Sequence, residues 1–306
     1  MKTEICLPND RAEWLKLRSM DVTSTEVSAL FKCNPWITEY ELYFQHKNNS
    51  ITELEETNRM KWGKRLEQAI ALCAADDKGW DVRHKPEYVR CPELRLGASF
   101  DYEAVDQGEP VLLEVKNVDA FRFKEGWLLD EEGNIEAPPH IEIQLQQQLM
   151  LTKLQRGFIV ALVGGNEIKY LERKADVGVQ SAIVAQSTRF WEAVDKGVPP
   201  EPDFARDASF IASLYSNATE GKILDSSNDE TFNNLMSAYK TLRTQRTEAE
   251  TKMKEIKAKI LMAAGDAAKV VGPWGSLSLG IVKGSTYTVE REAYRNFLPY
   301  FRKEKE

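Results

Sequence analysis

Four charged side chains in the middle of the sequence have the types and spacing needed to hold a divalent metal ion and act on a water beside it. Asp101 and Glu103 lie two residues apart in one short run, and Glu114 and Lys116 lie two apart in the next. Side chains two residues apart on a β-strand share a face, so pairing of the two runs brings the first acids opposite Glu114 and Lys116. Two carboxylates and a strand carbonyl, here that of Val115, are hard oxygen ligands that Mg²⁺ accepts while it keeps several waters.

The chemistry that this set of residues could perform is phosphodiester hydrolysis. A lysine beside the metal can orient an attacking water or help to deprotonate it, and it can stabilise the charge that grows on a phosphorane. The alternative is a surface hairpin on which Glu114 and Lys116 face solvent, because Glu-x-Lys is a common pattern on strands. The residues alone leave these two interpretations equally open.

A hairpin and the helices around it must position these residues. An antiparallel hairpin is predicted by the runs RLGASFDYEAV and VLLEVKN, which are joined by the turn-rich DQGEP. Apolar periodicity predicts one helix over residues 58–74 and another over IEIQLQQQLMLTKL. Two strands follow, FIVALV and EIKYLE, joined by a glycine pair, and a further helix covers residues 181–195.

The N-terminal segment contains a second candidate site, for an anion. The pattern from Arg11 to Phe31 is helical with one interruption, after which Thr23 and Glu26 fit a capping box. A helix that begins at Ser24 would direct free amides and the positive end of its dipole at an anion. Arg18 could add a bidentate guanidinium. The alternative is a solvated arginine near a helix-start hydroxyl.

The last hundred residues differ in character from the rest. The prolines of VPPEPDF end the regular structure, so we expect a boundary near residue 205 and domains at 1–205 and 206–306. In the second domain a heptad seam predicts a long helix paired with another helix. The seam residues are Leu235, Tyr239, Leu242, Arg246, Ala249, Met253, Ile256 and Ile260. Two short strands are expected beyond it, in SLSLGIV and TYTVE.

Composition narrows the class of protein. The 306 residues, 42% of them hydrophobic and 29% charged, suffice for one large or two modest domains. The sequence has neither an apolar run of about 18 residues nor a signal-peptide core, so we expect a cytoplasmic protein without a membrane association. The 4 cysteines and 3 histidines form no Cys-x-x-Cys or His-x-x-x-His pattern, which leaves carboxylates as the metal ligands.

Charge is distributed unevenly along the chain. Residues 206–306 hold 16 lysines and arginines against 13 acids, whereas residues 1–205 hold 25 against 35. The net negative charge of residues 1–205 argues against a protein that binds nucleic acid simply through a large basic surface. It does not exclude an enzyme that acts on nucleic acid, because ligand carboxylates add negative charge where a metal binds. Seven bases against three acids between residues 240 and 259 leave DNA contact by the long helix open.

In the order of its elements the chain resembles the PD-(D/E)XK nuclease core, with Phe100-Asp101 followed by Glu114-Val115-Lys116. More narrowly, it looks like the lambda exonuclease and YqaJ viral recombinase family. Five stretches match in family order: WLKLRSMDVTSTEVSALF, WGKRLEQAIA, GASFDYEA, LLEVKN and IEIQLQQQLMLT. The resemblance covers about two-thirds of the chain. It implies an α/β (α+β) fold in which helices flank a central mixed sheet, followed by a helical, coiled-coil-like extension and short terminal strands.

The resemblance also implies roles for individual residues. It makes Asp101 and Glu114 the metal ligands, together with the Val115 carbonyl, and Lys116 the catalytic lysine. Glu67 becomes a further carboxylate at the metal; the alternative is a helix-surface ion pair with Lys64.

The resemblance assigns glutamines and a phosphate pocket as well. Gln144 and Gln146 match the family's Gln-x-Gln and are expected near the attacking water or the scissile phosphate. The residues expected to hold the 5′-phosphate of a DNA end are Arg18, Thr25, Ser24 and Ser99. Two positions depart from the pattern: Phe100 replaces the proline of the motif, and Gln148 stands where relatives often have tyrosine.

The function that the resemblance implies is 5′-to-3′ digestion of double-stranded DNA by a Mg²⁺-dependent, alkaline-type exonuclease, which leaves 3′ single strands for phage-type recombination. It further implies two Mg²⁺ ions per site, with Mn²⁺ as an accepted substitute, a ring-shaped homotrimer, a RecT-like annealing protein as partner, and a phage or prophage origin. Two alternatives stay open. One is a PD-(D/E)XK endonuclease, and the other is a non-catalytic coiled-coil scaffold.

Overall fold

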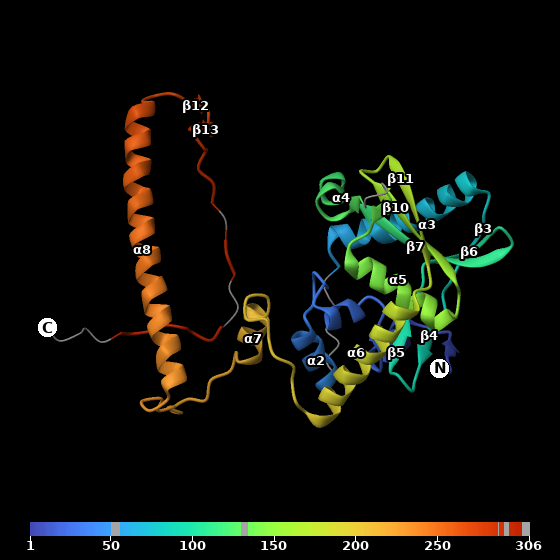
Figure 1. The fold of residues 1–306 in the computed structure, drawn as a ribbon. Helices are drawn as coiled ribbons and strands as arrows, with labels where there is room; N and C mark the ends of the chain where they lie inside the picture. The colour runs from blue at the N-terminus through green and yellow to red at the C-terminus, as the bar shows by residue number, and fades with distance from the viewer. Residues whose placement is uncertain (50–55, 130–133, 287, 291–293, 302–306) are drawn as a thin grey trace. The chain divides into compact units, whose positions relative to one another are not determined.

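The structure is a computed structural model that describes residues 1–49, 56–129, 134–286, 288–290 and 294–301. It divides the chain into two compact units, Met1–Ile211 and Ala212–Glu306 (Figure 1). The division lies slightly beyond the boundary expected near residue 205. No helix among the described residues is both long and apolar enough to cross a membrane.

A five-stranded mixed sheet forms the centre of the first unit. Its strands, in spatial order, are β11 (Glu167–Lys174), β10 (Arg156–Val163), β7 (Glu109–Val118), β6 (Tyr102–Asp106) and β3 (Asp81–His84). The β7–β10 pair is parallel and the other pairs are antiparallel.

The hairpin expected from the sequence is confirmed as β6–β7. Tyr102 lies opposite Leu113 and Glu103 opposite Leu112. Gln107 and Gly108 at its turn have φ values of 52° and 84°. A two-residue hairpin turn with both central residues left-handed matches the twist of paired strands, which explains the glycine.

Helices cover both faces of this sheet, as Figure 1 shows. On one face α3 (Asn58–Lys78) packs its apolar residues against a core that contains Val111, Leu113 and Val115. On the other face α5 (Pro139–Thr152) covers a core that contains Leu112, and α6 (Val177–Lys196) packs against α5. Because side chains alternate along a strand, Glu114 and Lys116 point to the α5 face.

A second sheet supports the N-terminal segment. Its order is β1 (Glu4–Cys6), β4 (Tyr88–Cys91), β5 (Leu96–Ala98) and β2 (Val22–Thr23). Within this sheet Asp21 is buried and accepts two hydrogen bonds from Arg90, at 2.7 and 2.9 Å. A Cβ on Gly97 would lie 2.0 Å from the Tyr88 hydroxyl, so this close packing requires glycine. These contacts hold the backbone in place at the residues that directly precede the expected anion site in the sequence.

The prediction of a helix that begins at Ser24 is wrong. After α1 (Arg11–Ser19) and β2, the chain makes a turn and then a five-residue 3₁₀-helix, η1 (Val27–Phe31). The capping pattern itself forms, since the Glu26 carboxylate accepts from the Thr23 amide at 3.0 Å. The Ser24 amide, however, donates to the Gly97 carbonyl at 2.9 Å because β2 pairs with β5. It is therefore not free to bind an anion.

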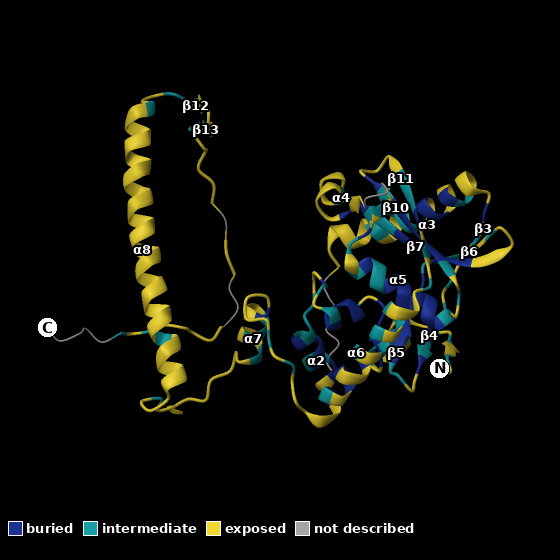
Figure 2. Cartoon of the chain, in the orientation of Figure 1, coloured by how far each residue is buried: buried dark blue, intermediate teal, exposed yellow. Residues whose placement is uncertain are grey.

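The remaining elements of the first unit connect or cover these layers. They are α2 (Glu39–Lys47), α4 (Ala120–Gly126), the short pair β8 (Leu128–Leu129) and β9 (Ile135–Glu136), and α7 (Ala208–Leu214) at the division between the units. Figure 2 shows the buried residues concentrated in the sheets and in the helices packed on them.

The second unit contains the expected long helix, α8 (Glu230–Ala264), and a hairpin of β12 (Lys269–Gly272) and β13 (Gly275–Ser278). The heptad seam along α8 is exposed in this unit (Figure 2). Of its side chains, Tyr239 meets Phe297 edge-on at 5.2 Å between ring centroids. In TYTVE, residue 287 lies outside the described part, and the others are not in a strand.

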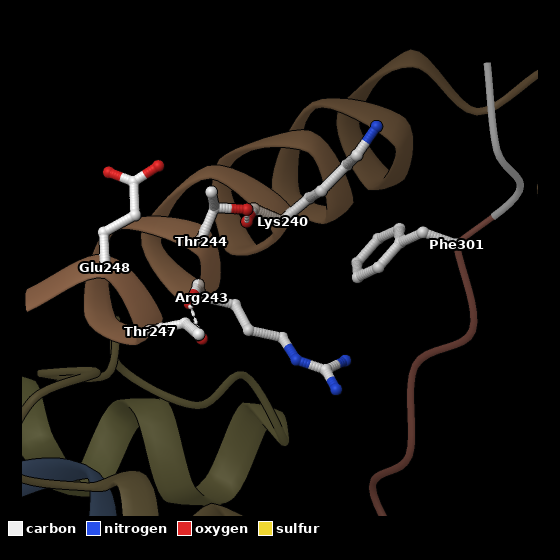
Figure 3. Close-up of a pocket in the computed structure, with 6 residues that line it drawn as sticks. All are labelled: Lys240, Arg243, Thr244, Thr247, Glu248 and Phe301. Carbon is white, nitrogen blue, oxygen red and sulfur yellow. Dashed lines mark hydrogen bonds between the residues drawn. The ribbon is translucent and has the colours of Figure 1, made fainter. Parts of the chain in front are cut away.

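An open pocket lies along α8 (Figure 3). Its lining residues are Lys240, Arg243, Thr244, Thr247, Glu248 and Phe301. Glu248 is the one carboxylate among these lining residues, and the acids singled out in the sequence all lie in the first unit.

Candidate active site

Glu114 is the centre of the candidate site. Its side chain, 2% exposed in the middle of β7, faces α5. Gln144 Nε2 donates to Oε1 at 2.7 Å, and Gln148 Nε2 donates to Oε2 at 2.7 Å. The Lys116 ammonium also donates to Oε1. Three donors, one of them charged, therefore hold this buried carboxylate in one orientation.

Asp101 lies beside Glu114, as predicted. It directly precedes β6, and its Oδ2 accepts from the Val115 amide of the neighbouring strand at 2.8 Å. Burial, and then the negative charge of Glu114, raise the pKa of Asp101 well above its ordinary value. Glu103, two residues on, is not part of this cluster, because it pairs with Arg83 and Lys85 at 2.5 and 2.9 Å.

Glu67 approaches the same cluster from α3. Burial and the charge of Glu114 raise the pKa of Glu67, while Lys116 opposes the shift. The helix-surface ion pair that was its alternative does not form, because Lys64 bonds to Glu56 at 2.6 Å instead. The structure thus brings three carboxylates and one lysine within electrostatic reach of each other.

The donors of this cluster fit a hard divalent cation such as Mg²⁺. Carboxylate and carbonyl oxygens are its preferred protein ligands, and it completes its shell with water. The raised pKa values of Asp101 and Glu67 reflect crowded negative charge that a cation would relieve. Among the described residues, no three histidine, cysteine, aspartate or glutamate side chains are close enough to enclose an ion on their own. A bound ion would therefore depend on water and backbone oxygen as well.

The glutamines of α5 divide between two sides of the helix. Gln144 and Gln148, one turn apart, both contact Glu114. Gln146 is not brought to the cluster, since its Nε2 donates to the Lys174 carbonyl at 2.8 Å and its Oε1 accepts from the Asp176 amide at 2.8 Å. The physical reason is the helical period, because residues two apart point in nearly opposite directions. The same period could have identified Gln148, which sequence analysis treated only as a departure.

Arg18 and Thr25 lie together, as predicted. Arg18 Nη2 lies 3.2 Å from Thr23 Oγ1, 3.3 Å from Thr25 Oγ1 and 3.4 Å from Glu26 Oε1. Its guanidinium also lies 4.5 Å from the centre of the Trp14 ring. The cluster is an arginine with two hydroxyls, which suits a phosphate, although Glu26 offsets part of the positive charge. Ser24 is buried and its amide is occupied, so it does not contribute in the way expected.

Ser99 connects the two clusters. Its hydroxyl accepts from the Trp14 indole at 3.0 Å, and its carbonyl accepts from Gln148 Nε2 at 3.1 Å. A continuous set of contacts therefore runs from Arg18 through Trp14, Ser99 and Gln148 to Glu114. The anion-binding candidates and the carboxylates are therefore joined by an unbroken chain of contacts within the first unit.

Residues 13–155 match the model of the YqaJ-like viral recombinase domain. This confirms the resemblance that the five sequence stretches indicate, and the matched range contains every residue of the site. The chain is 24% identical over 262 residues to the uncharacterized protein YqaJ of Bacillus subtilis strain 168, with 84% of this chain and 79% of that protein covered.

Solved structures support the fold. A crystal structure of LHK-Exo in complex with dAMP matches with a TM-score of 0.51 and 18% identity, covering 66% of this chain and 100% of that one. Another structure of this alkaline exonuclease, which comes from Laribacter hongkongensis, matches with a TM-score of 0.49 and 19% identity over the same shares. The expected fold, a central mixed sheet flanked by helices, is therefore confirmed.

Proposed function

We propose that this chain is a Mg²⁺-dependent exonuclease that hydrolyses phosphodiester bonds at the ends of double-stranded DNA. The observation that carries this proposal is the buried Glu114, held by Lys116, Gln144 and Gln148 beside Asp101. An ordinary surface hairpin has no reason to bury a carboxylate among three donors and a second acid. The match to the YqaJ-like viral recombinase domain and the likeness to LHK-Exo, which is an alkaline exonuclease, support the same function.

The site residues divide the chemistry between them. Asp101, Glu114, Glu67 and the Val115 carbonyl would hold two Mg²⁺ ions or Mn²⁺ in their place, and a bound ion supplies Lewis acidity to the phosphoryl group. Burial opposes the charge on Lys116, but Glu114 and Asp101 outweigh it and raise the pKa of the ammonium. Lys116 would then orient water and stabilise negative charge on the phosphate as a charged donor. Gln144 and Gln148 fix the carboxylate that it pairs with.

The end of the DNA is bound by the arginine cluster in this proposal. Arg18 and Thr25 would hold a 5′-phosphate, and the contacts that run from Arg18 through Trp14 to Ser99 support a position of that phosphate on the side of the carboxylates. This arrangement supports 5′-to-3′ digestion that leaves 3′ single strands.

The wider biology that we propose follows the family resemblance. It comprises phage-type recombination in the cytoplasm of a bacterial host, with a RecT-like annealing protein as partner. A homotrimeric ring around the duplex would retain DNA without a large basic surface, which suits the acidic residues 1–205.

End-labelled linear duplex tests the proposal, with the 5′ and 3′ labels followed separately in Mg²⁺ and in chelator. We expect Mg²⁺-dependent early release of the 5′ label as mononucleotide, while the 3′-labelled strand stays long. Early release of the 3′ label would reverse the polarity. A covalently closed circle should stay intact, and its cleavage would favour the endonuclease alternative. No nucleotide release under any condition would leave the scaffold interpretation.

A further inference from the structure

Trp36 combines an exposed side chain with a firmly held backbone. The residue is 74% exposed, whereas Asn34, two positions earlier, is 2% exposed. Asn34 Oδ1 accepts from the Trp36 and Ile37 amides at 2.9 and 3.0 Å, and the Arg206 guanidinium donates to the Asn34 carbonyl. Pro35 between them restricts the chain further. The large apolar surface that this loop presents is therefore fixed in place before any ligand arrives.

The same loop is bonded to the expected phosphate pocket. Asn34 Nδ2 donates to the Thr25 carbonyl at 3.0 Å and to Ser28 Oγ at 3.0 Å. Thr25 in turn lies against Arg18. One buried side chain thus fixes the loop of Trp36 relative to the residues that we assign to the 5′-phosphate.

On its other side Trp36 meets α5. Its ring lies 5.0 Å from the His140 ring, at an interplanar angle of 88°. His140 is in the first turn of α5, one turn before Gln144 and two before Gln148, so all three share a helix face. Burial and the charge of Lys116 lower the pKa of His140 to about 4, so the ring is neutral near pH 7. A neutral edge-on ring supports the indole and leaves the rest of it open to solvent.

We propose that Trp36, supported by His140, is a stacking site for the nucleobase at the 5′ end of the strand being digested. This inference rests on the proposed function, since it specifies how that site would hold its substrate. The loop of Trp36 is bonded to Thr25, and its indole packs on the helix that carries Gln144 and Gln148. This position suits the base of the terminal nucleotide, whose sugar joins the 5′-phosphate to the scissile phosphate. Stacking on an aromatic ring tolerates any base, which an end-resecting nuclease requires, and it changes affinity by about tenfold per base.

The experiment compares two duplexes that differ only in the 5′ terminal nucleotide, one with a normal base and one abasic, both 5′-phosphorylated. Single-turnover cleavage of each is measured for the parent, Trp36→Ala and Trp36→Phe, and binding of each is measured by anisotropy. Trp274→Ala is the control, because Trp274 is also exposed and lies in the β12–β13 turn of the second unit.

We expect the parent to bind the normal end about tenfold more tightly than the abasic end. Trp36→Ala should lose this preference, Trp36→Phe should keep part of it, and Trp274→Ala should match the parent. Equal preference in the parent and Trp36→Ala would overturn the stacking site while leaving the nuclease proposal intact. If Trp36→Ala lost the same affinity for both duplexes, the stacking site would also be overturned, since the lost contact would not involve the terminal base. If the parent cleaves neither duplex in Mg²⁺, the proposed function fails and the stacking site fails with it.

Discussion

The central sheet carries the pattern Glu-x-Lys on β7 and on β11, where it occurs as Glu167-Ile168-Lys169 and again as Glu172-Arg173-Lys174. Glu114-Val115-Lys116 and Glu167-Ile168-Lys169 each form an ion pair within the pattern, between the lysine ammonium and Oε1 of the glutamate. Lys116 lies opposite Ala161 of β10, and Ala161 lies opposite Lys169. The two lysines therefore stand in one row, on the same face of one sheet, two strands apart.

Their surroundings differ. The Glu114 side chain is 2% exposed and receives two glutamine amides, whereas the Glu167 side chain is 59% exposed on an edge strand. Asp101 and Glu67 add charge beside Glu114. Exposed ion pairs change little in a protein, while a buried, hydrogen-bonded one is held rigidly and is costly to disrupt. The comparison shows that the Glu-x-Lys pattern alone does not make a candidate site. The burial and the glutamine donors that α5 provides, together with the neighbouring acids, distinguish β7 from β11.

The largest expected effect separates the two lysines directly. Lys116→Ala should reduce cleavage of linear duplex by at least about a hundredfold, because it removes the charged donor from the reacting phosphate. DNA binding should persist. Lys169→Ala, the matched control from β11, should cleave at the parental rate, and single-turnover assays of both variants measure the difference. Equal rates in the two variants would remove the distinction between the strands.

The next largest effect is expected from the α5 glutamines that donate to Glu114. Gln148→Leu deletes a donor to Glu114 and should lower activity or metal affinity by about tenfold to a hundredfold, since ligand orientation depends on such contacts. Gln146→Leu removes the bonds to Lys174 and Asp176 instead. It should cost about 1–3 kcal/mol of stability with little change in activity per folded molecule. Isothermal metal titration and thermal unfolding distinguish the two results, and a reversed pattern would contradict our division of the helix.

The phosphate pocket should have a smaller effect, confined to one kind of substrate. A duplex with a 5′-phosphate should be digested about tenfold faster than one with a 5′-hydroxyl, because a hydrogen bond to a charged group adds this much. Arg18→Ala should abolish the difference, while Arg122→Ala, an exposed arginine paired with Glu125 on α4, should preserve it. Indifference of the parent to the phosphate would show that Arg18 and Thr25 serve another purpose.

The smallest effect concerns stability and pH. Because the pKa of Asp101 is raised in the folded protein, the folded state binds more protons there than the unfolded state does. The stabilisation from this carboxyl is complete below its unfolded pKa and is lost as the pH rises through the folded value. In chelator, the free energy of unfolding should therefore fall more between about pH 5 and pH 8 for the parent than for Asp101→Asn.

Urea denaturation at the two pH values measures this difference. Glu167→Gln, which removes an acid from the β11 pattern, should keep the parental slope. An excess of Mg²⁺ should reduce the slope of the parent, since bound cation replaces the proton. An unchanged slope in Asp101→Asn would show that the carboxylates near Glu114 are not coupled.

The sequence predicted the parts of the site that depend on local structure. Alternation along the two runs predicted the hairpin and brought Asp101 and Glu103 to the strand of Glu114. In the structure Tyr102 lies opposite Leu113, so Asp101 reaches Glu114 but Glu103 does not. Which face of α5 meets β7 depends on the tertiary fold, and four glutamines in five positions give no preference. For this reason Gln148 was missed and Gln146 was expected at the wrong place. The Ser24 helix failed for a similar reason, because pairing of β2 with β5 took its amide.

Long-range packing also accounts for the remaining differences. The heptad pattern predicts a second helix against α8, and the described part of that unit leaves the pattern exposed. Trp36 gave no signal in the sequence, because its significance comes from residues far along the chain. Its ring meets His140, and Arg206 bonds to the Asn34 carbonyl of its loop. Periodicity in the sequence identifies the apolar face of a helix or strand, but it does not identify which element packs against that face.

The parallel pairing of β7 with β10 also affects how the protein reaches its active form. Parallel strands need a crossover, and here the crossover contains α5, which carries Gln144 and Gln148. These amides can reach Glu114 only after residues 119–155 have closed into a loop, a step whose entropic cost slows folding. A newly made chain with its hairpin formed would thus still lack the amides that hold Glu114, and these contacts would form together with completion of the sheet.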